Sequence, residues 1–114
     1  MPTRLVTVVE TKAFSTQAKG RMKSKEVGAL IDLLAADPEC GDLIRQTGGL
    51  RKVRFAVGGK GKSASVRVVY YFYNETMPVF LLAVFAKHER ENLSKAERNT
   101  LAKVARALLD SYGE

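Results

Sequence analysis

Seven lysines and arginines fall within the 32 residues from Leu43 to Asn74, a stretch that contains no Asp or Glu. The rest of the chain carries equal numbers of both signs, so this stretch accounts for the whole net charge of +7. A concentrated cationic surface on a small domain is typical of proteins that bind polyanions, most often nucleic acid. The seven residues are Arg45, Arg51, Lys52, Arg54, Lys60, Lys62 and Arg67.

The same stretch has the pattern of two β-strands joined by a glycine-rich polar loop. In residues 50–57, apolar side chains alternate with Lys52 and Arg54. Residues 66–73 are β-branched and aromatic, as strands are, and include Arg67. If the strands pair as a hairpin, the three cations can share one face. An ordinary solvent-exposed face also carries charge but mixes both signs, so the missing counter-charge favours a functional surface.

Cations alone can support cleavage of RNA, because the 2′-hydroxyl of RNA is a built-in nucleophile. Arginine suits the phosphate oxygens, since it is permanently charged and fork-shaped. Lysine can act as base or acid when neighbouring cations make it less basic. Lys52, flanked by Arg51 and near Arg54, is such a candidate. The pattern by itself supports nucleic-acid binding and is compatible with cleavage.

Other chemistries lack their residues. The acidic residues are scattered and none lies in the basic strands, so the clustered carboxylates of a metal-dependent nuclease are not expected. A single histidine provides no histidine pair for acid–base work. Gly61-Lys62-Ser63 matches only the end of a P-loop, because Ala56 occupies the first glycine position. We therefore expect no metal and no cofactor.

Length and composition predict a single domain over residues 1–114, with 46% hydrophobic residues. The one cysteine, Cys40, excludes a disulfide within the chain. No apolar run approaches the roughly 18 residues of a membrane span, and Met1 to Val6 lacks the long apolar region of a signal peptide. We expect a cytoplasmic protein that does not associate with membranes.

The order of expected elements is β-α-α-β-β-β-α, with three consecutive strands joined by short turns. It predicts an α+β domain: an antiparallel sheet with helices mainly on one face and cations lining the partly open other face. Strand 79–86 is apolar on both sides, which indicates a central, covered strand. The elements are a strand at 5–9, a helix at about 12–20, a helix capped by Ser24 and ended by Asp37-Pro38, strands at 50–57, 66–73 and 79–86, and a helix after the capping box Ser94–Glu97.

Two motifs, Thr-Gly-Gly-Leu-Arg-Lys-Val-Arg at 47–54 and Gly-Lys-Gly-Lys at 59–62, form a specific pair. Together with 67–72, 81–87 and a helix start at Leu93-Ser94, they resemble the RelE/ParE superfamily of type II toxins, and within it the HigB-type branch. The resemblance covers roughly residues 41–109. It implies a RelE-like fold and a ribosome-dependent, metal-independent mRNA endonuclease that inhibits translation.

The resemblance also implies roles for individual basic residues. By position, Lys52 and Arg54 would take the base and phosphate-binding roles on the second strand. Arg67 would be the phosphate-stabilising arginine of the third strand. Lys87 lies where the fourth strand delivers a further basic residue. These four are the expected catalytic residues.

The proton donor and the contacts to RNA stay open. RelE has a tyrosine near the start of the last helix, where this chain has Ser94. His88 is one substitute, since some HigB toxins use a histidine near this strand end. Tyr71 could stack on a base if it shares the Arg67 face, or it could be a packed sheet aromatic. The expected RNA-binding residues are Arg51, Lys60, Lys62, Tyr71 and His88.

The expected partners are the ribosome, mRNA and a cognate antitoxin, which in HigB-type systems often has a helix-turn-helix domain. Two alternatives stay open. One is a ParE-like gyrase inhibitor without catalysis, although such proteins usually lack the full basic set. The other is an RNA-binding module without activity, which predicts salt-dependent RNA binding and no cleavage.

Overall fold

A computed structural model of the protein describes residues 5–58, 64–90 and 92–112. Lys60 and Lys62, two of the expected RNA-binding residues, lie outside the described residues. No helix among the described residues is long and apolar enough to cross a membrane. The elements are β1 (Val8–Glu10), α1 (Lys12–Ala18), α2 (Ser24–Ala36), β2 (Asp42–Leu43), β3 (Leu50–Val57), β4 (Ala64–Tyr71), β5 (Val79–Ala86) and α3 (Lys95–Tyr112).

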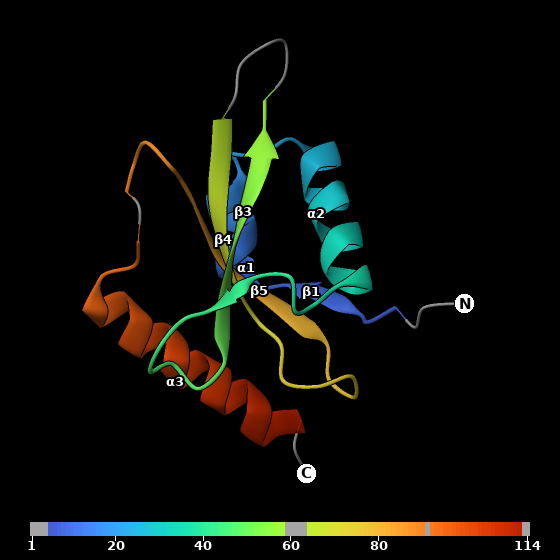
Figure 1. Cartoon of the computed structure of the whole chain (residues 1–114), viewed down its shortest axis with the longest axis vertical. Coiled ribbons are helices and arrows are strands. Elements are labelled where there is room, and N and C mark those ends of the chain that lie inside the picture. Colours follow the sequence, from blue (N-terminus) through green and yellow to red (C-terminus); the bar gives the residue numbers. More distant parts are fainter. Residues whose placement is uncertain (1–4, 59–63, 91, 113–114) are drawn as a thin grey trace.

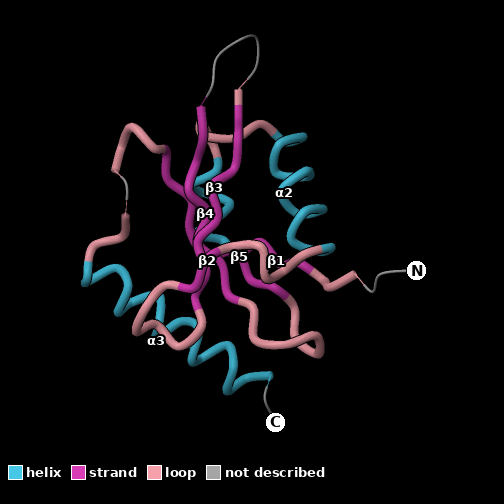
Figure 2. The backbone as a smooth tube through the Cα atoms, viewed as in Figure 1, coloured by secondary structure: helices cyan, strands magenta, loops and turns pink. Residues whose placement is uncertain are grey.

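The strands form one five-stranded sheet in the order β1-β5-β4-β3-β2 (Figures 1 and 2). Strands β2 to β5 make an antiparallel meander, whereas β1 pairs parallel with β5. The predicted α+β fold is confirmed. The structure adds the edge strand β2, and β1 makes the sheet mixed rather than wholly antiparallel.

Helices cover both faces of this sheet, unequally. Phe14 of α1 and Leu30 of α2 pack with Val68 of β4 in one core, so these two helices share a face. Helix α3 lies across the opposite face, where Ala105 packs in a second core with Leu50 of β3. Figure 1 shows α2 and α3 on opposite sides of the sheet. Two of the three helices thus share a face, and the α3 side stays uncovered near the tip of the β3–β4 hairpin.

The β3–β4 hairpin is in the register that the alternation predicts. Val53 and Phe55 of β3 contact the α1–α2 core, and Leu50 lies in the α3 core. Arg54 is the direct partner of Arg67, and the pairing continues to the ends of both strands. Strand β4 covers 64–71 rather than the expected 66–73.

Helix ends follow the sequence signals, with one correction. Ser24 is the first residue of α2 and not its cap; Lys23 is the cap residue, and its backbone N–H donates to Glu26 Oε1 at 2.7 Å. At α3 the capping box is confirmed: the Glu97 N–H donates to Ser94 Oγ at 3.1 Å, and the Ser94 N–H donates to Glu97 Oε1 at 2.8 Å. Helix α2 ends two residues before Pro38, as predicted.

A buried tyrosine anchors the segment that leads into β2. Tyr70 of β4 donates its hydroxyl proton to the Pro38 carbonyl at 2.7 Å and accepts the Gly41 N–H at 2.9 Å. A Cβ atom added to Gly41 would lie 2.8 Å from Tyr70 Oη and 2.9 Å from the Lys52 carbonyl oxygen. Both neighbours are held in the sheet, so this position has room only for glycine.

We predict that Gly41→Ala destabilises the protein by about 1–3 kcal/mol, because the added methyl group overpacks the contact between the 38–41 segment and the sheet. Gly28→Ala is the matched control. Gly28 lies within α2 with no atom near its missing Cβ, so alanine there should stabilise by about 1 kcal/mol. Urea unfolding measures both, and a Gly41→Ala protein as stable as the wild type would contradict the packing argument.

Candidate active site

Three of the expected catalytic cations lie on one face of the hairpin, the side that α3 partly covers. Arg54 and Arg67 are direct cross-strand partners, and Lys52 pairs with Val69, a residue of the α3-side core. Paired residues of antiparallel strands point to the same face, and Lys52 and Arg54 are two residues apart. We call Lys52, Arg54 and Arg67 the basic patch.

The members of the basic patch differ in exposure and in hydrogen bonding. Arg54 is exposed. Lys52 is half-buried, and its Nζ donates to Asn92 Oδ1 at 2.6 Å. Arg67 is buried, and its guanidinium donates to Ser65 Oγ at 3.0 Å. None of the three forms an ion pair with an acidic residue in the described part of the chain, so an incoming anion meets no competing carboxylate.

Arg67 is the most unusual of these cations, since only 5% of its surface is exposed. It pairs across the strands with Phe85, and the guanidinium of Arg90 lies 4.6 Å from the centre of the Phe85 ring. A charge removed from water without a counter-charge is costly. A phosphate group at this position would supply the missing negative charge.

Lys87 and His88 follow β5, and they have different neighbours. The Lys87 N–H donates to the Ser65 carbonyl at 3.2 Å, so the backbone of Lys87 lies beside the residue that holds Arg67. The Lys87 side chain is exposed. His88 lines a hollow of about 410 Å³ with Lys19 and Arg21, from the turn between α1 and α2. The backbone of Lys87 is thus adjacent to the basic patch, whereas His88 borders a hollow that Ser65 shares with the turn between α1 and α2.

Two of the expected RNA-binding residues are used inside the fold. Arg51 is on the opposite face from the basic patch; its guanidinium donates to the carbonyls of Glu39 and Gly41 at 3.1 and 2.7 Å. Tyr71 does share the Arg67 face, but it is 1% exposed and packs in the α3-side core. Burial raises the pKa of its hydroxyl. In this structure Arg51 holds the loop and Tyr71 is the packed aromatic; a role of either residue in RNA binding stays a prediction.

The sequence did not single out Asn92 or Arg98, and it gave Arg45 no site role; all three join Lys52 around a hollow of about 470 Å³. Asn92 is a loop residue before α3, and no local pattern connects it to a strand 40 positions earlier. Arg98 is in the first turns of α3 and would be indistinguishable from a solvent-exposed helix residue. Arg45 belongs to the cationic stretch, and its charge is the one signal that could have indicated the hollow.

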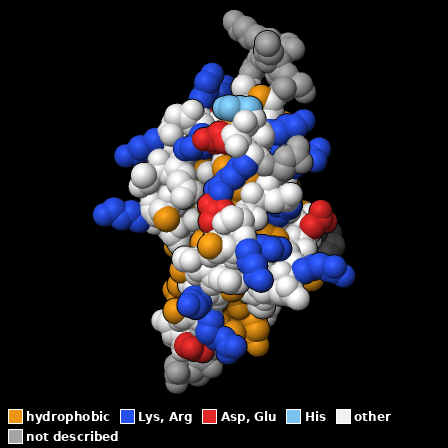
Figure 3. All heavy atoms as spheres, turned by 90° about the vertical axis from the view of Figure 1, so that its left-hand side faces the viewer, with side chains coloured by type: hydrophobic (Ala, Val, Ile, Leu, Met, Phe, Trp, Pro, Cys, Tyr) orange, Lys and Arg blue, Asp and Glu red, His pale blue; other side chains and the backbone are white. Residues whose placement is uncertain are grey.

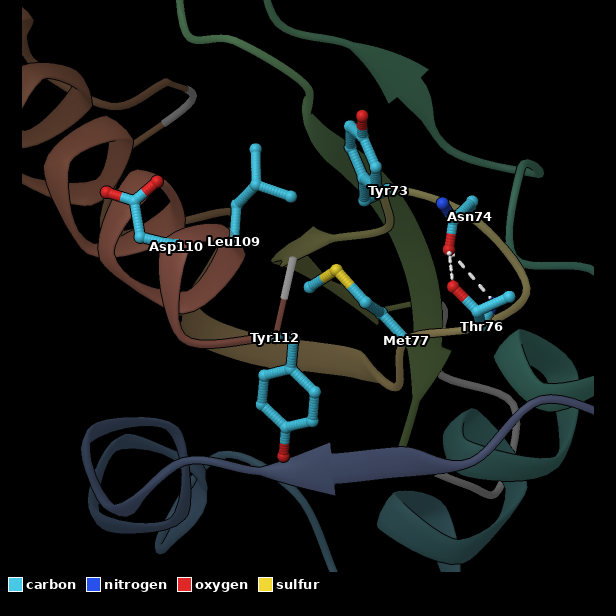
Figure 4. Close-up of a pocket in the computed structure, with 7 residues that line it drawn as sticks. All are labelled: Tyr73, Asn74, Thr76, Met77, Leu109, Asp110 and Tyr112. Carbon is cyan, nitrogen blue, oxygen red and sulfur yellow. Dashed lines mark hydrogen bonds between the residues drawn. The ribbon is translucent and has the colours of Figure 1, made fainter. Parts of the chain in front are cut away.

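A larger hollow, of about 580 Å³, lies at the other end of α3 (Figure 4). Tyr73, Met77 and Tyr112 line it, together with Asp110, and it contains none of the candidate cations. In the described ranges, no group of three or more His, Cys, Asp or Glu side chains could hold a metal ion. The basic patch therefore remains the candidate active site.

The surface seen from the α3 side carries many Lys and Arg side chains and few Asp or Glu, with hydrophobic side chains gathered toward its lower end (Figure 3). A family model of the RelE toxin of the RelE/RelB toxin–antitoxin system matches residues 7–114. The chain belongs to the RelE toxin family.

This RelE toxin is therefore the toxin component of a type II toxin–antitoxin system. RelE family toxins generally pair with an antitoxin and act on ribosomes. The match confirms the resemblance to the RelE/ParE superfamily. The match also covers the N-terminal strand and helices, which lie outside the roughly 41–109 range of the resemblance. The HigB-type branch stays a prediction.

The turn that carries Lys87 and His88 in this RelE toxin is fixed by one carboxylate. Glu89 accepts two hydrogen bonds from Arg21, at 2.8 and 2.6 Å, and one from the Ala86 N–H at 2.7 Å. The bond from Arg21, with that from Ala86, lowers the pKa of Glu89 from 4.5 to about 2. The ion pair therefore joins the end of β5 to the turn between α1 and α2.

We predict that Glu89→Gln reduces the loss of folding stability that acid causes, so that the stability–pH curve is flatter on its acid side. Because the pKa of Glu89 is lower in the folded state, its contribution is fully present above about pH 4.5 and is lost as the pH falls toward 2. The variant should lose stability at pH 7 and show a smaller further loss between pH 5 and 2.5. Denaturant unfolding across this range measures it.

Glu75→Gln is the control, because Glu75 is exposed and forms no ion pair in the described part of the chain. Its curve should follow that of the wild type. An acid limb of equal slope in Glu89→Gln and the wild type would show that the Arg21–Glu89 pair does not hold the turn.

Proposed function

We propose that this RelE toxin is an endoribonuclease of the HigB type that cleaves mRNA in the ribosomal A site, without a metal ion, and thereby inhibits translation. The single observation that carries the proposal is the basic patch: three cations share one face of the hairpin, and no carboxylate in the described part of the chain pairs with them. Family membership supplies the ribosome as the place of action.

The cations divide into roles by their environment. Arg67 is buried and held by Ser65, so its planar fork is preorganised to receive two phosphate oxygens. Arg54 is opposite it and exposed, so a phosphate can lie between two guanidinium groups. Together they would stabilise the extra negative charge that develops on the pentacoordinate phosphorus.

Lys52 would act as the general base on the 2′-hydroxyl. In its neutral amine form it takes the proton while the 2′-oxygen bonds to phosphorus and the bond from phosphorus to the 5′-oxygen breaks. The products are a 2′,3′-cyclic phosphate and a free 5′-hydroxyl, whose proton comes from an acid at the site. Asn92 Oδ1 accepts a hydrogen bond from Lys52 Nζ, which supports a fixed position for the nitrogen.

Lys87 and His88 are the two candidates for the acid that gives a proton to the 5′-oxygen, and Lys87 is the better placed of them. Its backbone is hydrogen-bonded to Ser65, next to Arg67. His88 borders the hollow on the side of the α1–α2 turn. We therefore assign the proton donor to Lys87.

The proposal includes control by a partner. An acidic or mixed-charge antitoxin, with a helix-turn-helix domain as in HigB-type systems, would neutralise the toxin in the cytoplasm, where translating ribosomes are found. An acidic segment over the basic patch would occupy the phosphate position.

We predict that Lys52→Ala and Arg54→Ala each slow mRNA cleavage on programmed ribosomes by about 100-fold or more, the usual contribution of a general base or of one phosphate donor. Primer extension on the mRNA measures discrete cuts, which should vanish when ribosomes are omitted. Lys25→Ala is the matched control, because Lys25 is exposed on α2, on the opposite face of the sheet.

Arg67 is tested by Arg67→Lys, because an alanine would leave a cavity at this buried position. The lysine keeps the charge and loses the fork, so the cleavage rate should fall while the unfolding midpoint changes little. Wild-type protein that makes no cuts on ribosomes, or cuts that persist in Lys52→Ala and Arg54→Ala, would refute the proposal. Inhibition of DNA supercoiling without mRNA cuts would favour a gyrase inhibitor instead.

A further inference from the structure

Two neighbouring hollows lie beside α3, and the first of them includes Lys52 of the basic patch. One wall is α3, and the other is the segment 42–48, which includes β2 and the loop after it. At one end is the hollow of about 470 Å³ lined by Lys52, Arg45 and Arg98. Farther along α3, a second hollow of about 410 Å³ is lined by Thr47, Gly48 and Arg106. We call this feature the α3 groove.

The α3 groove is cationic along its length. Arg45 and Arg98 line the first hollow with Lys52, and Arg106 lines the second. Within the described residues, none of these four forms an ion pair, whereas Arg21, Arg51 and Arg90 each do. The one acidic residue that lines the first hollow is Asp42. The cations of the groove therefore remain available to a ligand.

The loop wall of the groove is rigid before any ligand binds. Thr47 is buried; its hydroxyl donates to the Ile44 carbonyl at 2.6 Å and accepts the Leu50 N–H at 3.2 Å. Gly48 and Gly49 have φ values of +76° and +122°, which residues with a side chain rarely adopt. The Thr-Gly-Gly-Leu motif thus shapes a tight loop beside α3 and fixes the position of Arg45. A preorganised wall reduces the entropic cost of binding.

We propose that the α3 groove binds the single-stranded RNA that flanks the scissile linkage, with Arg45, Arg98 and Arg106 contacting phosphates along the strand. This inference rests on the proposed function, since it assumes that Lys52 lies at the cleaved linkage. It assigns a binding role to α3 and to the 42–48 segment that is separate from the chemistry at the basic patch.

Two arguments favour single-stranded RNA over another occupant. The groove begins at Lys52, and a substrate strand longer than one linkage must leave the site along some surface. Cations spaced along the path match the repeating charge of a nucleic-acid backbone. An acidic protein segment is the competing occupant, and the test below distinguishes it.

The test is the affinity of the purified full-length protein for 2′-O-methyl RNA, which lacks the nucleophilic hydroxyl and cannot be cleaved by this route. Fluorescence anisotropy with oligonucleotides of about 4 and about 12 nucleotides, over a series of salt concentrations, gives both affinity and salt slope. The longer RNA should bind more tightly to the wild type. In Arg98→Ala/Arg106→Ala the magnitude of the negative slope of log K against log salt should decrease by about 1.4, because each phosphate contact on a single strand contributes about 0.7.

The matched control is Lys12→Ala/Lys25→Ala, which removes two exposed cations from α1 and α2 on the other face and should leave the slope unchanged. Equal slopes in both double variants would overturn the groove assignment, as would a loss of antitoxin affinity in Arg98→Ala/Arg106→Ala with RNA affinity unchanged. Cleavage is measured separately. Wild-type protein that binds RNA in the groove but cuts no mRNA would refute the proposed function and leave the groove standing.

Discussion

The β3–β4 register is the constraint on which the rest of the structure depends. It places Arg54 directly opposite Arg67, although like charges in cross-strand positions destabilise a sheet. What holds this register is the reverse side of the hairpin. Val53 and Phe55 of β3 face the same core as Val68 of β4, and a slip of β3 by one residue would turn them out of this core and turn Arg54 into it. The apolar face thus enforces a cationic face that would not form by itself.

A second set of contacts fixes the segments around the basic patch. The turn after β5 is held by the Arg21–Glu89 pair, and the start of α3 by its capping box, where Arg90 pairs with Glu97. The side-chain hydrogen bond from Arg90, with the hydrogen bonds from Ser94, lowers the pKa of Glu97 to about 2. In both places the carboxylate neutralises a cation outside the patch. Glu89 and Glu97 thus hold backbone, and no carboxylate in the part of the chain that the structure describes pairs with the catalytic candidates.

Much of the fold could be predicted because the deciding signals are local. Alternation in 50–57 and the capping box at Ser94 each contain their own evidence, and the structure confirms both. Strand β2 has two residues, too few for any periodicity, and its formation depends on β3 already being in place. The parallel pairing of β1 with β5 joins residues about 70 positions apart, so no local sequence pattern predicts it.

The positions of the candidate residues were predictable to the same extent. The contacts that the sequence did not predict depend, again, on elements far apart in the chain. Lys52, Arg54 and Arg67 follow from the strand pattern. Whether Tyr71 stacks on a base or packs in a core depends on where α3 crosses the sheet, and the pattern of β4 is the same in both cases. Arg51 was assigned to RNA by its charge, whereas the contacts that bind it come from carbonyl groups of a loop without regular structure. Asn92 and Arg98 belong to the site only because α3 begins beside β3.

The unpaired cations imply a trade between stability and function. Among the described residues no carboxylate pairs with the buried Arg67, and Arg54 opposite it adds repulsion, so the free toxin holds electrostatic strain at its site. Any anion that binds there relieves this strain, and a ligand that binds only the folded state stabilises it in proportion to its affinity. A phosphate of RNA and a carboxylate of an antitoxin satisfy the same requirement. On the proposed function, RNA and an acidic segment of the antitoxin would compete for these cations.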